Sequence, residues 1–243
     1  MVVFIAFWIL MGLTAANHRR LADIRAKSWE DWVLDVTGLL FQGLIIPILQ
    51  TTVVYQLYSF LLPHHHDCLN LPAVAAFLLS FVFVDYLYYW NHRLLHSRWW
   101  HLHKVHHTLT DRNVLGTSRN TLWTSFFIIY LWIHPLFIYL LADPSWYIAG
   151  ASLTSALDLW RHSEIKPAPG SFFHRLLSPW LILPCNHAWH HSKNSNIGNF
   201  GANFKIWDKI HGTDYTSDYP PKVLGIEIQL SLTQKLILPF LFK

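Results

Sequence analysis

The chain has 243 residues, of which 53% are hydrophobic and only 13% are charged, and its formal net charge is +4. A soluble domain carries about 25% charged residues, so this composition favours an integral membrane protein. Two cysteines are too few for a disulfide framework or a thiolate zinc site. The basic residues form no dense run, and positive-inside bias explains them better than a nucleic-acid partner, so we expect no nucleic-acid binding.

The predicted membrane elements are apolar segments, which lie at 1–16, 33–62, 71–90, 121–141 and 145–160. Segment 33–62 is longer than the about 20 residues that cross a bilayer, and Pro47 could kink it. The turn Ala142-Asp143-Pro144 predicts that the last two segments form a hairpin. The fold expected is therefore an all-α integral membrane protein with about four to five membrane helices or half-hairpins.

The chain contains no Gly/Ser-rich linker and no repeat, which predicts a single domain over 1–243. Within it we expect N-terminal membrane segments at 1–62 and a core at 71–215. The apolar end, interrupted by Pro239, predicts an interfacial helix at 226–243.

Lysine and arginine are distributed unevenly along the chain. They are confined to 17–32, 91–120, 161–225 and the C-terminal tail, and none lies in the turns 63–70 and 142–144. The positive-inside rule places the first three of these segments on the cytoplasmic side. We therefore expect a cytoplasmic cap beyond the ends of the membrane helices.

Three histidine clusters lie in or beside those same segments. They are His92 with His96; His103 with His106 and His107; and His187 with His190 and His191. Residues three or four apart share one face of a helix, whereas adjacent residues diverge by about 100°. One zinc ion takes four ligands, so eight imidazoles with this spacing favour two metal ions held by the cap.

Imidazole ligands suit iron or zinc, and the scarcity of carboxylates argues against magnesium or calcium. His162, at the end of the 145–160 segment, is a natural ninth ligand. Metal-bound imidazoles commonly donate their second N–H to a carboxylate. Asp85, about two turns before His92, and Asp158, four residues before His162, are expected in that orienting role. Asn199 and Asp208 are further candidates around the ligands.

The ordered motifs resemble the membrane fatty acid hydroxylase / sterol desaturase superfamily over about 80–215. They are Asp85-Tyr-Leu-Tyr-Tyr-Trp90-Asn-His92-Arg93-Leu-Leu-His96, His103-x-x-His106-His107, His187-x-x-His190-His191, Asn199-Phe-Gly201 and Trp207-Asp208-x-x-x-Gly212-Thr213. The resemblance implies that the nine histidines bind two iron ions, which zinc can replace on purification. It also implies O2 as co-substrate and a separate electron donor such as cytochrome b5, ferredoxin or a reductase.

The function expected is hydroxylation, or alternatively desaturation, of a C–H bond in a lipid, a sterol-like compound or another apolar metabolite taken from the bilayer. A zinc-dependent membrane hydrolase is an alternative and would need a general base such as Glu164 or Asp158. A histidine-rich metal transporter is another, although transport ligands usually lie near the bilayer midplane. A bacterial inner membrane is the favoured location, or the endoplasmic reticulum if the source is eukaryotic.

Overall fold

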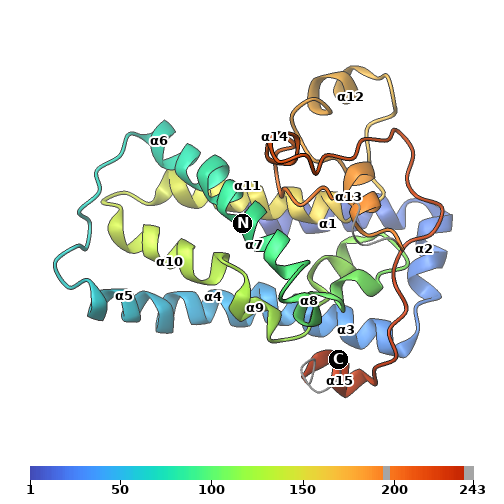
Figure 1. Cartoon of the computed structure of the whole chain (residues 1–243), viewed down its shortest axis with the longest axis horizontal. Coiled ribbons are helices and arrows are strands. Elements are labelled where there is room, and N and C mark those ends of the chain that lie inside the picture. The colour runs from blue at the N-terminus through green and yellow to red at the C-terminus, as the bar shows by residue number, and fades with distance from the viewer. Residues whose placement is uncertain (194–197, 238–243) are drawn as a thin grey trace.

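The computed structural model describes residues 1–193 and 198–237, and the regular elements of this part of the chain are all helices (Figure 1). The α-helices are α1 (Val2–Ala15), α2 (His18–Arg25), α3 (Trp29–Leu40), α4 (Ile46–Leu49), α5 (Tyr55–Leu61), α6 (Ala73–Leu78), α7 (Val84–Leu95), α8 (Trp100–His103), α9 (Thr124–Phe127), α10 (Tyr130–Leu140), α11 (Ser145–Arg161), α12 (Phe172–Leu177), α13 (Pro184–His190), α14 (Ile206–Ile210) and α15 (Leu232–Leu236). Three π-helical segments, η1 (Phe41–Ile45), η2 (Gln50–Val54) and η3 (Leu79–Phe83), and two 3₁₀ turns, η4 (His106–Thr108) and η5 (Val114–Ser118), complete the set.

Two continuous helical rods are long and apolar enough to cross a membrane. The first, Trp29–Leu61, has 33 residues and joins α3, α4 and α5 through η1 and η2, and an 18-residue stretch within it has a mean hydropathy of 1.8. At 1.5 Å per residue it is about 50 Å long, which exceeds the about 30 Å of the hydrocarbon core. The second, Ala73–Leu95, joins α6 and α7 through η3 and has 23 residues. The fold is therefore an all-α integral membrane protein, as the composition predicts.

By length and hydropathy alone, two helices of the described residues qualify as membrane spans, fewer than the four to five expected. The pair α1 and α2, bent by 104°, would add a third span if it crosses as one unit. α10 is apolar but has only 11 residues. Pro47 lies at the start of α4, directly after η1, so a π-helical turn accommodates the proline within the first rod.

Helix α10 begins at Tyr130, nine residues later than the predicted segment 121–141. A tertiary contact breaks the helix there, because the side chain of Asn91 donates to the carbonyl of Phe127 at 2.9 Å. The same side chain accepts a hydrogen bond from the N–H of Ile129 at 3.1 Å. Ile128, between the two, has extended backbone angles. The polar side chain of Asn91 thus replaces a helical turn.

The predicted helix over 226–243 is wrong within the described residues, where only Leu232–Leu236 is helical. The N–H of Gly225 donates to the carbonyl of His191 at 2.9 Å, and the N–H of Ile226 donates to the carbonyl of His107 at 2.8 Å. These bonds hold the chain extended across the histidine clusters. The last six positions of the prediction, 238–243, lie outside the described residues.

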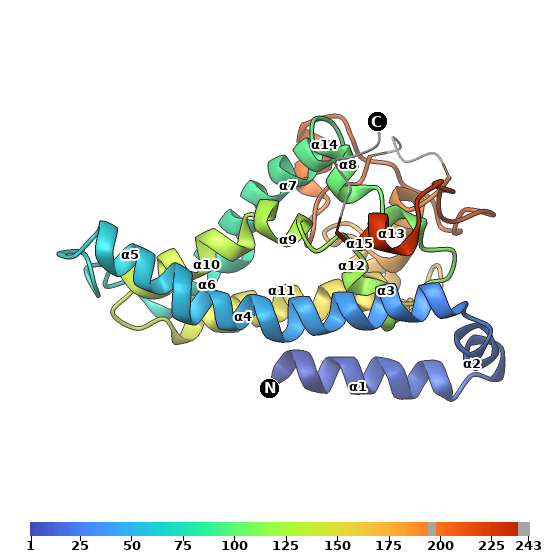
Figure 2. The same cartoon turned by 90° about the horizontal axis from the view of Figure 1, so that it is seen from below.

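The elements gather at two ends of the molecule. In both views α5, α6 and α10 lie at one end, and α8 and α13, which carry histidines, lie toward the other (Figures 1 and 2). A core of Ala76, Val84, Leu141 and Tyr147 joins the second rod to α10 and α11. The N-terminal end of the first rod and the C-terminal end of the second rod therefore lie in one cap region.

The first rod is fixed to the cap by a close backbone contact and a buried ion-pair network. A Cβ atom on Gly38 would lie 2.2 Å from the carbonyl oxygen of Ser118, so only glycine permits this approach. Beside it, the buried guanidinium of Arg119 donates to Asp35 and to Asp31, each at 2.7 Å. Lys27 also pairs with Asp35, whose side chain is fully buried. Three buried charged side chains, those of Lys27, Asp35 and Arg119, thus neutralise one another together with the half-buried Asp31.

Removing one charge from this network should be costly, because a buried ion pair broken on one side leaves an uncompensated charge. We predict that Asp35→Asn lowers the free energy of unfolding by about 3 kcal/mol, measured by urea titration in mild detergent with tryptophan fluorescence. Asp23→Asn, at an exposed position of α2, is the matched control and should change little. Equal stability of the two variants would contradict the network's role.

Candidate di-metal centre

The structure brings all nine predicted histidines together in the cap. Eight of them form two groups, in each of which the nitrogen donors lie within 4.8 Å of one another. The first group is His92, His96, His103 and His190, and the second is His106, His162, His187 and His191. Every member is buried except His96, which is half-buried. The two groups adjoin, since the rings of His103 and His106 stack at 4.9 Å.

The nitrogen separations match the edges of a metal coordination shell. Metal–nitrogen bonds of 2.0–2.1 Å at tetrahedral to octahedral angles give N···N distances of about 2.8–3.4 Å. In the first group the Nε2 atoms of His92 and His103 are 3.1 Å apart, as are those of His96 and His190. In the second group the Nε2 separations along His106, His162, His187 and His191 are 3.3, 2.9 and 3.1 Å.

Backbone carbonyls fix which nitrogen of four imidazoles carries the proton. Nδ1 of His106 donates to the carbonyl of Arg119 at 3.0 Å, and Nδ1 of His162 donates to the carbonyl of Asp158 at 2.9 Å. A carbonyl only accepts, so in the neutral rings both Nε2 atoms are unprotonated. Their lone pairs then face each other at 3.3 Å, which is repulsive unless a cation lies between them.

The first group repeats this arrangement. Nδ1 of His92 donates to the carbonyl of Phe200 at 2.9 Å, and Nδ1 of His190 donates to the carbonyl of Gly198 at 2.8 Å. The Nε2 atoms of both rings are therefore free to coordinate a metal. Each group thus contains two imidazoles pre-set as ligands, and this donor set fits two iron or zinc ions.

Burial keeps these imidazoles neutral. It lowers the pKa of His190 to about 4, and the same desolvation lowers the pKa of His103 and His187 well below the ordinary value. Neighbouring imidazoles lower these pKa values further, because a second positive charge in the cluster would be repelled. At neutral pH the rings are in the form that binds metal.

His107 lies between the two groups. Its Nε2 is 3.1 Å from Nε2 of His96, and its ring stacks on that of His191 at 4.5 Å. The adjacent residues His106 and His107 therefore serve different groups, and so do His190 and His191. His107 is placed as a fifth donor beside the first group.

One loop, 198–204, supplies two of the orienting carbonyls, and the predicted Asp208 and Asn199 hold it. The carboxylate of Asp208 accepts the N–H groups of Phe200 and Gly201, both at 2.8 Å, and the hydroxyl of Thr213. Asn199 has a left-handed backbone, with φ of 57°, and its amide donates to the carbonyl of Asn186 at 2.9 Å. Both residues therefore hold the loop whose carbonyls accept from His92 and His190.

Asp85 also contacts the loop, whereas the sequence predicts that it accepts a ring N–H. Its carboxylate accepts the N–H of Asn203 at 2.7 Å, the N–H of Phe204 at 3.2 Å and Nε1 of Trp207 at 2.6 Å. The ring of His92 instead uses the carbonyl of Phe200. Asp85 therefore anchors the far end of the loop that orients this histidine.

Asp158 lies close to its predicted partner. Its carbonyl accepts Nδ1 of His162, and its carboxylate is 3.5 Å from the same nitrogen. The carboxylate is held by Arg161 at 2.7 Å. Asp158 is thus placed to orient His162.

Sequence reasoning missed the main orienting groups, because they are backbone carbonyls. It also missed Arg119, whose ion pairs with α3 position the carbonyl that accepts from His106. The one sequence feature that marks the loop is the Asn199-Phe-Gly201 motif, and the motif does not indicate which contacts the loop makes. No pattern in the sequence predicts that the backbone N–H groups of Gly225 and Ile226 donate to the carbonyls of His191 and His107.

Comparison with known proteins places the centre within a family. A family model described as fatty acid hydroxylase matches residues 77–213. Ornithine lipid hydroxylase OlsE of Rhizobium tropici is 29% identical over 164 residues, which are 66% of this chain and 47% of that protein. Alkylglycerol monooxygenase of Homo sapiens is 29% identical over 55% of this chain and 29% of its own length.

Very-long-chain aldehyde decarbonylase GL1-11 of Oryza sativa subsp. japonica is 30% identical over 58% of this chain and 53% of its own length. The chain thus spans about half, or less, of the length of these relatives. No solved structure matches the chain significantly.

The position of Asp85 generates a prediction about metal affinity. Asp85→Asn keeps the side chain's size but turns an NH2 group toward donors that need an acceptor, so the loop should loosen. Loss of a partner one step from a ligand typically costs 10–100-fold in metal affinity, and we expect a loss of about that size. Competition of the anaerobically iron-loaded protein with a ferrous chelator measures it.

The matched control is Asp143→Asn, in an exposed turn between α10 and α11. It should retain iron as the wild type does. Identical retention by the Asp85 variant would show that the loop does not depend on this carboxylate.

Proposed function

Because the chain belongs to the fatty acid hydroxylase family, we propose that it is a membrane-bound di-iron oxidoreductase that uses O2 to hydroxylate a C–H bond of a lipid or similarly apolar substrate. The single observation that carries the proposal is the pair of adjoining four-histidine groups with facing Nε2 atoms. The names of two relatives, a lipid hydroxylase and an alkylglycerol monooxygenase, support this reaction class. Two iron ions bound here would supply O2 activation and the oxidation of an unactivated C–H bond.

The protein's own part is to hold the ligands in one geometry and to exclude water. The orienting carbonyls fix four rings, and nearly all the imidazoles are buried. A dry, preorganised site strengthens electrostatic interactions and limits side reactions. These features suit a centre that must form a reactive oxidant beside its own side chains.

The approach for an apolar substrate is along the second rod. His92 and His96 lie at the C-terminal end of Ala73–Leu95, so the same helix runs from the apolar segment to the centre. The ring of Tyr88, one turn before His92, lies 5.2 Å from it and stacks on Tyr130 of α10 at 4.8 Å. This pair of stacked rings gives the centre an aromatic wall on the side of the spans.

We further propose that the centre faces the cytoplasm, since the basic segments 17–32, 91–120 and 161–225 all belong to its side by the positive-inside rule. A bacterial inner membrane is favoured, or the endoplasmic reticulum in a eukaryote. Electrons would come from a separate donor such as cytochrome b5, ferredoxin or a reductase. Such a donor approaches from the aqueous side.

The contacts of the acidic residues do not favour a hydrolase. Glu164 pairs with Arg20 at 3.1 Å and lies 3.9 Å from Arg112. Asp158 pairs with Arg161 and adjoins His162. Both carboxylates are thus engaged by cations, and neither is held free beside the nitrogen groups as a general base would be.

Labelled oxygen tests the proposed reaction. Membranes of cells that express the chain, exposed to ¹⁸O2, should contain a lipid that carries one new hydroxyl with one ¹⁸O atom, detected by mass spectrometry. His106→Ala removes a donor from the second group and should lower this product by about 100-fold or more.

The control is His64→Ala, which removes an exposed imidazole outside both groups and should leave the product unchanged. Label incorporated from H2¹⁸O instead of ¹⁸O2 would favour hydrolysis and contradict the oxygenase. A lipidome identical in cells that express wild type and His106→Ala would also contradict it.

A further inference from the structure

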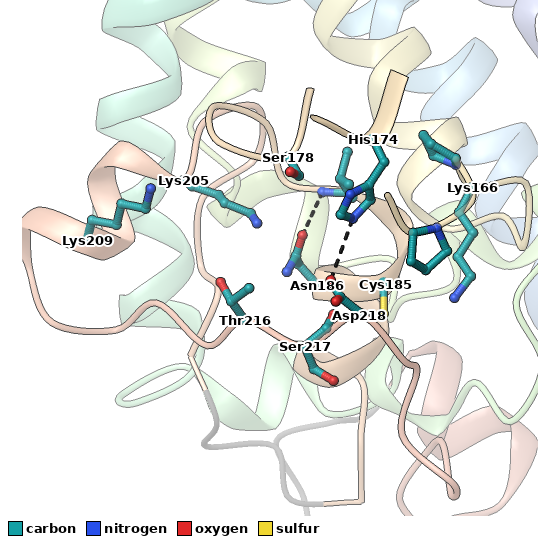
Figure 3. A pocket seen from close by; sticks show the side chains of 13 residues that line it. Lys166, His174, Ser178, Cys185, Asn186, Lys205, Lys209, Thr216, Ser217 and Asp218 are labelled. Atoms are coloured by element: carbon teal, nitrogen blue, oxygen red, sulfur yellow. Dashed lines mark hydrogen bonds and ion pairs between the residues drawn. The ribbon is translucent and has the colours of Figure 1, made fainter. Parts of the chain in front are cut away.

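A small cavity lies beside the start of α13, and no member of the two histidine groups lines it (Figure 3). Its volume is about 150 Å³. Three segments enclose it, namely the loop and helix before α13, the start of α13 itself, and the region from α14 to 218. The residues that matter here are Lys166, His174, Ser178, Lys205, Lys209 and Asp218.

Basic side chains outnumber acidic ones in the lining. Lys166, Lys205 and Lys209 all contribute, whereas Asp218 is the only acidic residue that lines the cavity. Asp218 is more than half exposed and is directed to His174, at 3.6 Å. The cavity therefore carries an excess of positive charge.

Lys205 is the unusual member of this set. It is only 3% exposed, and its side chain points into the cavity (Figure 3). Among residues 1–193 and 198–237 its ammonium has no hydrogen-bond or ion-pair partner. By contrast, Lys209 donates to the carbonyl of Pro179 at 3.2 Å.

An ammonium at the end of an almost fully buried side chain is costly without a partner, because its loss of hydration is compensated only by a counter-charge or hydrogen bonds. Burial lowers the pKa of Lys205, while Asp214 and Asp218 act on it only from a distance. An anion in the cavity would supply the missing charge. The hydroxyl of Ser178, which makes no hydrogen bond within the described chain, offers a neutral donor on the same lining.

We propose that this cavity binds a phosphate group through Lys205, with Lys166, Lys209 and Ser178 around it. Lysine binds phosphate as a point charge, and several lysines suit a group with more than one negative charge. Drug-sized ligands occupy pockets of about 300–1,000 Å³, so the cavity is too small for a whole nucleotide. A single head group fits this volume.

The neighbouring surface indicates that the phosphate belongs to a membrane lipid. Helix α12, which contributes His174 to the cavity, exposes Phe172, Phe173 and Leu176, and Trp180 follows it. Apolar and aromatic side chains beside a basic pocket are typical of protein at the bilayer interface. The acyl chains would lie against this apolar patch while the head group enters the cavity.

Phosphate binding to the purified protein in a phosphate-free maltoside detergent tests the proposal, by calorimetry at constant ionic strength. Inorganic phosphate should bind saturably, and Lys205→Gln should raise its Kd by about tenfold or more, because a charged hydrogen-bond partner is lost. Lys222→Gln removes one exposed positive charge outside the cavity and should leave the Kd unchanged.

Lys166→Gln, at a half-buried position, provides the second variant if Lys205→Gln does not fold, and should raise the Kd about two- to fivefold. Absence of saturable binding, or an equal Kd in Lys205→Gln, Lys222→Gln and wild type, would overturn the site. The measurement involves no turnover, so its failure leaves the proposed oxygenase unaffected.

Competition then identifies the source of the phosphate. Phosphatidic acid in mixed micelles should displace inorganic phosphate, whereas diacylglycerol, which lacks the phosphate, should not. Displacement by both, or by neither, would overturn the assignment to a lipid head group. If neither lipid displaced inorganic phosphate, the Lys205-dependent site would bind free phosphate.

Discussion

The centre depends on imidazole nitrogens that face one another with unprotonated lone pairs. In each group two rings have their Nδ1 atoms committed to backbone carbonyls, so their Nε2 atoms can only accept. The separation of 3.3 Å between Nε2 of His106 and Nε2 of His162 would then be repulsive in the absence of a cation. A divalent ion between the two nitrogens would convert this repulsion into coordination, and burial opposes protonation of the rings as an alternative.

Several charged residues of the cap contact the backbone segments that orient the histidines of the two groups. Asp85 and Asp208 accept N–H groups of the 198–204 loop, and that loop presents its carbonyls to His92 and His190. On the other side, ion pairs of Arg119 with α3 fix the carbonyl that faces His106. Contacts of Arg119 therefore link the first membrane rod to the histidine groups. Ligand geometry is set by the fold of these segments and not by the histidines alone.

The histidines could be predicted from the sequence because their spacing is a local property of helices, as in His187, His190 and His191. The orienting groups could not, since any residue can present a carbonyl and Phe200 carries no mark of that role. The sequence places Asp85 in the correct region but predicts a ring N–H as its partner. Its carboxylate instead accepts from the loop, which is distant in sequence. The predicted helix boundaries are wrong where tertiary hydrogen bonds replace helical ones, as at Asn91 and at 225–226.

Iron stoichiometry after anaerobic ferrous reconstitution tests the central claim most directly. If the two histidine groups are metal sites, the detergent-purified protein should bind about two iron ions per chain, and His106→Ala should bind markedly less, since one of four ligands is lost. No bound metal in the wild-type protein would contradict the account. The facing imidazoles would then have to be stabilised by protons or solvent.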